Sequence, residues 1–157
     1  RENPRQMRTI TVSTVTALAV FSAVLTMGRE YVSDYELYDA SYTALARWVD
    51  TSTEPDDIFL TAPNHNNAVS SLTGRNIVCG SGTFLYYHGV DYAQREADIK
   101  VMYEDPLRRS ELVKTYKVSY IVIGSQELSS YSIPDYDALL SLYDVVYDKN
   151  GVVVLAV

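Results

Sequence analysis

Polar side chains that could bind a ligand follow each of three predicted strands. They fall in the segments 64–67, 80–88 and 124–127. Ligands of open α/β sheets bind at the carboxyl ends of the strands, so we expect these segments to line one pocket for a sugar or a pyrophosphate. The candidate substrate-binding residues in and between these segments are Asn64, His65, Arg75, Tyr87, His88, Arg95 and Glu127.

Each candidate also has a structural interpretation. A histidine at position 65 is typical of a helix N-terminus, and Asp91 is expected to cap a helix. Arg75 could hold Glu127 or Asp98 in an ion pair. The sequence leaves both interpretations open, because it does not show whether the candidates converge on one pocket.

No complete active site is predicted. Gly80-Ser81-Gly82 follows a strand, but the third glycine of a dinucleotide-binding motif would fall at Leu85. The soft metal ligands His65, His88 and Cys79 are too few for a structural zinc site. We therefore expect no catalytic residue, no metal and no cofactor, and we expect Cys79 to be buried and inert.

Hydrophobic periodicity and turn residues define the elements that must position these side chains. The run VSYIVIG (118–124) predicts a central strand buried on both faces, and Asn150-Gly151 predicts a tight hairpin turn. The predicted elements are a helix over 36–50, a strand over 57–62, a helix from its cap Asn64 to Leu72 ended by Gly74, a strand over 76–79, an aromatic turn over 84–89, helices over 91–104 and 106–116, a strand over 118–124, a helix over 136–142, and hairpin strands over 144–147 and 152–157. This order predicts an α/β fold, a small three-layer domain with a mainly parallel sheet and a C-terminal antiparallel hairpin.

An apolar segment precedes this domain. Residues 9–28 are twenty residues without a charge, bounded by Arg8 and Arg29, and as a helix they would span about 30 Å, the hydrocarbon thickness of a bilayer. Basic residues before the run and acidic residues after it place the N-terminus in the cytoplasm and the rest outside the plasma membrane. One alternative is a cleaved signal peptide, although residues 25–28 match a cleavage site poorly. The other is a buried amphipathic helix, although no face of the run carries a charge. We expect residues 1–29 to form the cytoplasmic flank and transmembrane helix, and residues 30–157 an extracytoplasmic domain.

The charge of the sequence argues against nucleic acid as a partner, and its tyrosines indicate the kind of surface it presents. Residues 29–157 carry 10 basic and 19 acidic side chains, a net charge of −9. Nucleic acid is therefore not expected as a partner, because its phosphates need a basic face. All fourteen tyrosines follow residue 28, which is typical of half-buried packing or of a saccharide-binding or lipid-interface surface.

Three segments carry a resemblance to a known family. They run from Thr53 to Gly80, from Phe84 to Tyr103 and from Tyr116 to Gly124, and their most specific patterns are H-N-N…G-R and H-G-x-D-x-x-x-R-x-x-D. Together they resemble the C-terminal extracytoplasmic domain of multi-pass GT-C glycosyltransferases related to the polyprenyl-phosphate-sugar-dependent mannosyltransferases. The resemblance covers roughly residues 10–157.

The resemblance implies an accessory role. The catalytic acids of that family lie in an early extracytoplasmic loop, so no residue of this sequence inherits their role. It implies a domain that helps to shape the acceptor or lipid-linked sugar site, with the lipid bilayer, a polyprenyl-phosphate sugar and upstream transmembrane helices of the same protein as partners. Because the sequence opens on Arg1 rather than Met, we expect such helices to precede it.

Two other functions stay open. The chain could be a single-pass, membrane-anchored binding or sensor domain, or a small α/β enzyme in its own right. Upstream hydrophobic segments in the encoding open reading frame would favour the glycosyltransferase interpretation over the sensor.

Overall fold

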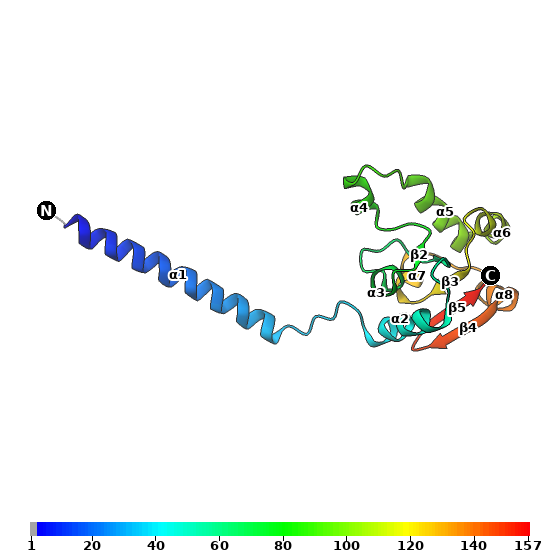
Figure 1. Ribbon diagram of the computed structural model, residues 1–157, viewed down its shortest axis with the longest axis horizontal. Coiled ribbons are helices and arrows are strands. Elements are labelled where there is room, and N and C mark those ends of the chain that lie inside the picture. Colours follow the sequence, from blue (N-terminus) through cyan, green and yellow to red (C-terminus); the bar gives the residue numbers. More distant parts are fainter. Residues whose placement is uncertain (1–2) are drawn as a thin grey trace. The chain divides into compact units, whose positions relative to one another are not determined.

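The computed structural model describes residues 3–157, which fall into two compact units (Figure 1). The first contains helix α1 (Pro4–Val32), whose cap Asn3 accepts a hydrogen bond from the amide of Arg5 through its side-chain oxygen. The helix is long and apolar enough to cross a membrane, as a signal sequence also would be, and none of its most apolar window is buried. The predicted apolar helix is therefore confirmed, and it continues beyond the uncharged residues 9–28 at both ends.

The second unit, Leu37–Val157, is the α/β domain. Its elements are α2 (Ala40–Ser52), β1 (Ile58–Leu60), α3 (Ala68–Thr73), β2 (Asn76–Ile77), α4 (Gly82–Tyr87), α5 (Ala93–Glu104), α6 (Pro106–Thr115), β3 (Tyr120–Ile123), α7 (Ser125–Ser130), α8 (Tyr136–Leu142), β4 (Asp144–Lys149) and β5 (Val152–Ala156).

The five strands form a mixed sheet in the order β2-β1-β3-β5-β4. β1 pairs in parallel with β2 and β3, whereas β5 pairs antiparallel with both β3 and β4. The expectation of a mainly parallel sheet is therefore wrong, although the C-terminal hairpin and the central place of β3 are confirmed. The hairpin folds β5 back between β4 and β3, where its backbone groups find partners on both sides.

Side chains of the strands alternate between two helical layers, as the pleat requires. Ile121 and Leu155 face one core, which they share with residues of α5, α6 and α8. Val122 and Val154 face the other core, with residues of α2 and α3. The predicted three-layer arrangement is confirmed.

Turn and cap residues agree with the sequence at some positions and not at others. Gly74 ends α3 with φ +69°, and Asn150 and Gly151 have the positive φ angles (55° and 76°) that the hairpin turn needs. The prediction that Asn64 caps α3 is wrong, because Asn67 caps this helix by accepting a hydrogen bond from the amide of Ser70. Asp91 is not the cap of α5 either, since that helix begins one residue later, after Tyr92.

Two short helices replace predicted loops. α4 contains the predicted aromatic turn, and α7 follows β3 directly. Neither has the length or the repeating apolar residues by which a helix is recognised in a sequence. Both lie just after strands, so they decide which side chains meet at that edge of the sheet.

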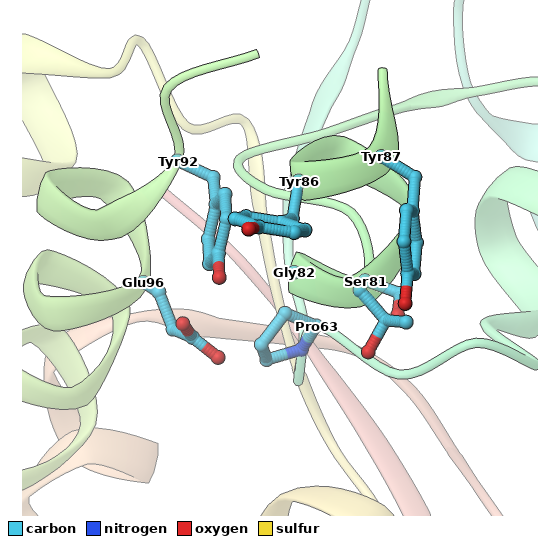
Figure 2. A pocket seen from close by; sticks show the side chains of 8 residues that line it. Pro63, Ser81, Gly82, Tyr86, Tyr87, Tyr92 and Glu96 are labelled. Atoms are coloured by element: carbon cyan, nitrogen blue, oxygen red, sulfur yellow. The ribbon is translucent and has the colours of Figure 1, made fainter. Parts of the chain in front are cut away.

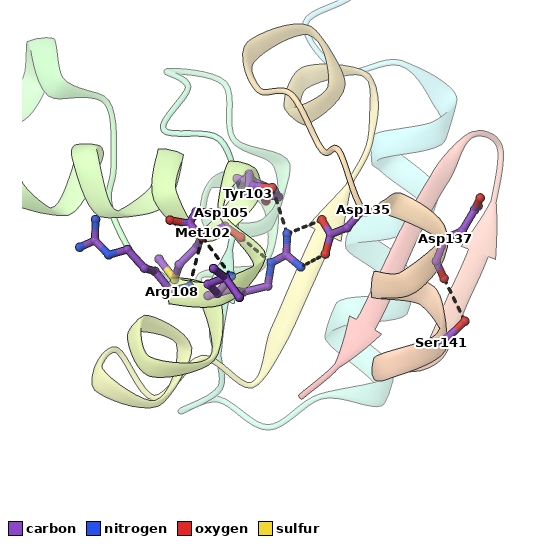
Figure 3. A network of polar contacts seen from close by, with 9 residues as sticks. Met102, Tyr103, Asp105, Arg108, Asp135, Asp137 and Ser141 are labelled. Atoms are coloured by element: carbon purple, nitrogen blue, oxygen red, sulfur yellow. Dashed lines mark hydrogen bonds and ion pairs between the residues drawn. The ribbon is translucent and has the colours of Figure 1, made fainter.

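A buried guanidinium joins α5 and α6 to the segment before α8 (Figure 3). Arg109, 2% exposed, donates to the carbonyl oxygens of Met102 and Tyr103 at 2.7 and 3.1 Å. Its two terminal nitrogens also donate to the Asp135 carboxylate, at 2.6 and 2.8 Å. These bonds from Arg109 hold the pKa of Asp135 below its usual value.

Candidate functional site

The α/β domain contains an open cleft of about 430 Å³ lined by three tyrosine rings (Figure 2). Its eight lining residues are Pro63, Ser81, Gly82, Thr83, Tyr86, Tyr87, Tyr92 and Glu96. The cleft combines aromatic ring faces with hydroxyl groups and one carboxylate. This mixture suits a ligand that has both an apolar face and polar substituents.

The cleft lies where β1 and β2 end. Pro63 follows β1, while Ser81 and Gly82 lead from β2 into α4, which carries Tyr86 and Tyr87. The carboxyl ends of parallel strands are where open α/β sheets bind ligands. This is the edge at which the sequence predicts a ligand site, so the cleft is a candidate for it.

Two tyrosines of α4 present their rings to solvent. Tyr86 and Tyr87 are 69% and 80% exposed, and their rings meet edge to face with centroids 5.5 Å apart. Large apolar surface left in water carries a free-energy cost of about 25 cal/mol per Å² that a bound partner would relieve. The pair is thus available for contact with a ligand.

Gly82 makes room for the third ring. A Cβ atom at this position would lie 2.6 Å from Cε2 of Tyr92, closer than any real contact of that kind. The absence of a side chain at Gly82 therefore lets the Tyr92 ring pack against the first turn of α4 and form one wall of the cleft.

Glu96 gives the cleft its only formal charge. Tyr92 precedes α5 and Glu96 lies in its first turn. The neighbouring Arg95 points elsewhere: it donates to the carbonyl oxygen of Val78 at 3.1 Å, and its guanidinium lies 5.8 Å from the centroid of the Tyr116 ring. Arg95 lines a second cavity of about 340 Å³ instead.

The structure brings some predicted site residues together near α4 and α7. Tyr87 lines the cleft. His65 stacks on Phe84 of α4 with ring centroids 4.4 Å apart, and Asn64 donates to the side-chain oxygen of Gln126 in α7 at 3.0 Å. His88 is exposed at the C-terminal end of α4. The segments after β1, β2 and β3 are thus in contact, as the sequence predicted.

Arg75 does not belong to this group. It precedes β2, and it donates to the carbonyl oxygen and the hydroxyl of Thr53, which precedes β1, at 3.0 and 3.2 Å. Both residues lie at the amino ends of two parallel strands, at the edge opposite the cleft. The expected ion pair with Glu127 or Asp98 is also wrong, because backbone and hydroxyl oxygens of Thr53 take the guanidinium's hydrogen bonds.

Glu127 is buried and does not line the tyrosine cleft. At 1% exposure its carboxylate accepts hydrogen bonds from the amides of Ala62 and Gly124, at 2.9 and 3.0 Å. It thereby joins the end of β1 to the end of β3. Burial raises the pKa of this carboxyl, and the two amide bonds oppose that rise.

Cys79 is buried, as predicted, at 4% exposure. Burial raises the pKa of its thiol, and the nearby Glu96 raises it further. A raised pKa disfavours the thiolate, which is the nucleophilic form. Among residues 3–157, no three His, Cys, Asp or Glu side chains are grouped to hold a metal ion.

The segment 80–88, which was predicted to bind a ligand, supplies five of the eight lining residues: Ser81, Gly82, Thr83, Tyr86 and Tyr87. Of these only Tyr87 was named as a single candidate residue, and Tyr92 and Glu96 were not predicted. One pattern in the sequence points to these last two: they are four residues apart, so a helix places them on one face.

Comparison with protein-family models gave no match, and comparison with curated proteins gave none either.

Proposed function

We propose that this protein contributes a membrane-tethered, non-catalytic binding domain to a GT-C-like glycosyltransferase, in which the tyrosine cleft binds a saccharide. In this role the domain helps to shape the acceptor or lipid-linked sugar site from the extracytoplasmic side. The observation that carries the proposal is the open cleft lined by Tyr86, Tyr87, Tyr92 and Glu96.

The cleft's chemistry supports a saccharide ligand. A pyranose ring has C–H faces that pack on aromatic rings and hydroxyls around its rim. Tyr86 and Tyr87 supply exposed ring faces, while Ser81 and Glu96 supply oxygen atoms for the rim. The eight lining residues include no histidine, cysteine or lysine, and Glu96 is the single carboxylate among them, whereas glycoside hydrolysis uses a pair of carboxylates. This supports binding over catalysis.

The sequence around α1 supports the tether and its direction. Arg5 and Arg8 precede the apolar run, whereas Glu30, Asp34 and Glu36 follow the point where it ends. Cytoplasmic flanks of membrane helices are enriched in basic residues. The α/β domain then lies outside, where glycans and lipid-linked sugars with exposed head groups occur. The resemblance of segments 53–80, 84–103 and 116–124 to GT-C proteins points the same way.

The test is a binding titration with the full chain in lipid nanodiscs, which avoid sugar-based detergents. Chemical shifts of ring-labelled tyrosines are followed while neutral and amino monosaccharides are added. A small open cleft predicts dissociation constants of about 1 mM, or a binding free energy of about −4 kcal/mol. Tyr86→Ala and Tyr87→Ala should each weaken binding severalfold, because each removes a ring face.

Two further variants sharpen the test. Tyr35→Ala is the matched control, since Tyr35 is 75% exposed but does not line the cleft. Gly82→Ala should weaken binding without removing any ligand contact, because its methyl group displaces the Tyr92 ring. If no saccharide binds, or if Tyr35→Ala weakens binding as much as Tyr87→Ala, the cleft is not a saccharide site.

A further inference from the structure

We propose that the ligand of the tyrosine cleft presents a protonated amine, so that the cleft selects amino sugars over neutral and phosphorylated ones. This inference rests on the proposed saccharide-binding function and concerns the same site. It follows from the charge of the cleft and from the arrangement of its aromatic rings.

The charge of the lining disfavours anions. Of the eight lining residues only Glu96 is charged, and none is basic. Phosphate groups are bound in proteins by arginine, lysine or several convergent amides. The nearest basic residue in sequence, Arg95, is engaged by Val78 and Tyr116 and lines the other cavity. The whole domain adds to this field, because residues 37–157 carry 9 basic and 16 acidic side chains, a net charge of −7.

The aromatic rings favour a cation. The face of a tyrosine ring carries negative potential, and an ammonium group within about 6 Å of a ring centroid is attracted to it. The rings of Tyr86 and Tyr87 are inclined at 77° to each other, so they do not form one flat stack. Tyr92 adds a third ring to the lining. Figure 2 shows the Glu96 carboxylate and the hydroxyls of Tyr92 and Tyr87 on the side of the cleft where Pro63 lies.

Glu96 is free to bind an ammonium group. The two ion pairs found within residues 3–157 join Lys100 to Glu104 and Arg109 to Asp135, and neither involves Glu96. A carboxylate in the first turn of a helix also offsets the helix dipole. That structural role predicts a change in stability on substitution, whereas the proposed role predicts a change in ligand preference.

The experiment compares ligands that differ only in charge, using the full chain in phosphatidylglycerol nanodiscs and a buffer without amines, at pH 6. One pair is glucosamine and glucose, and the other is choline and its neutral isostere 3,3-dimethylbutan-1-ol. Glucose 6-phosphate is the anionic probe. Glucosamine should bind about fivefold tighter than glucose, which is the gain expected from one exposed charge pair. Glucose 6-phosphate should bind most weakly.

Variants assign the preference to Glu96. Glu96→Gln should remove the preference for glucosamine over glucose, whereas Glu111→Gln should keep it. Glu111 is an exposed acid of α6 that does not line the cleft, so its substitution changes the net charge equally.

The outcomes separate the two proposals. Equal affinity for glucose and glucosamine overturns the amine inference and leaves the saccharide proposal standing. Binding of choline but not of its isostere, without binding of any sugar, overturns the saccharide proposal and the selection of amino sugars, and leaves only the preference for a protonated amine. A preference for glucosamine that survives in Glu96→Gln overturns the inference as well.

Discussion

The Arg109–Asp135 ion pair gives the sharpest prediction about stability. Asp135→Asn keeps the shape of the side chain but removes its charge. The amide can still accept one hydrogen bond from Arg109, while its NH2 group faces the second guanidinium nitrogen, donor against donor. Removing one partner of a fully buried pair costs about 3–5 kcal/mol. Because the Asp135 side chain is 20% exposed and one bond survives, we expect a loss of about 2 kcal/mol at pH 7.

The pH dependence of this loss follows from the lowered pKa of Asp135. A depressed folded-state pKa contributes stability that is present above the unfolded value of 3.8 and is lost as pH falls through the folded value. The asparagine variant has no such group. The difference between the native chain and the variant should therefore shrink as pH falls from about 5 to about 2.5.

The assay is denaturant-induced unfolding of the full chain in nanodiscs, followed by the fluorescence of Trp48. This single tryptophan packs against Tyr147 and Tyr120 in the core on the opposite face of the sheet from Arg109. It therefore reports cooperative unfolding and not a local change around α6. Asp137→Asn, an exposed acid on α8, is the control and should change stability by about 0.5 kcal/mol or less. A loss for Asp135→Asn that is no larger than this, or that is the same at both ends of the pH range, would refute the reasoning.

Three further substitutions test other contacts by the same unfolding assay. Burial raises the pKa of Glu127, so this carboxyl stabilises the folded state below about pH 4.5, and that stabilisation is lost as pH rises through the folded-state pKa. Glu127→Gln should therefore gain stability relative to the native chain between about pH 4.5 and pH 7. Free energies of unfolding that differ by a constant amount across this pH range would contradict this. Tyr147→Phe should stabilise the domain by about 1 kcal/mol, since within residues 3–157 the buried hydroxyl of Tyr147 has no hydrogen-bond partner; a loss of stability would show that the hydroxyl is satisfied. Arg75→Ala should cost about 1–2 kcal/mol through its bonds to Thr53 and leave saccharide affinity unchanged, and a selective loss of affinity would return Arg75 to the site.

The predictable part of the fold is the part that hydrophobic pattern and backbone geometry determine. Residues 118–124 are mostly apolar, and they contain the central strand β3 (Tyr120–Ile123). Asn150 and Gly151 adopt the left-handed angles for which the hairpin needs them. In both cases the local sequence alone carries the physical cause.

Strand pairing was harder to predict because it depends on distant partners. Asn150-Gly151 predicts the β4–β5 hairpin but not its place in the sheet. The local sequence does not show which other strand β5 pairs with. The run VVVLA (152–156) did contain a sign: like β3 it is apolar on both faces, which is typical of an interior strand.

The candidate cleft lies at the sheet edge that the sequence predicts for a ligand site, but of the seven candidate residues only Tyr87 lines it. The positions of Asn64, His65 and Tyr87 followed from the rule that ligands bind where strands end. Arg75 precedes its strand, so the same rule places it at the opposite edge. The burial of Glu127 could not be foreseen, because α7 is too short to show a periodic pattern and its carboxylate bonds the amide of Ala62, 65 residues away.

The interior position of β5 also sets the order in which the domain can be completed during synthesis. β4 and β3 are made earlier, yet each pairs with β5 and not with the other. Until residues 152–156 have emerged, β3 presents an open row of amide and carbonyl groups to any extended chain nearby. For copies held side by side on one surface, this interval favours exchange of the last strand between neighbours. The final hairpin is thus both the closing step of maturation and the step at which two copies could become entangled.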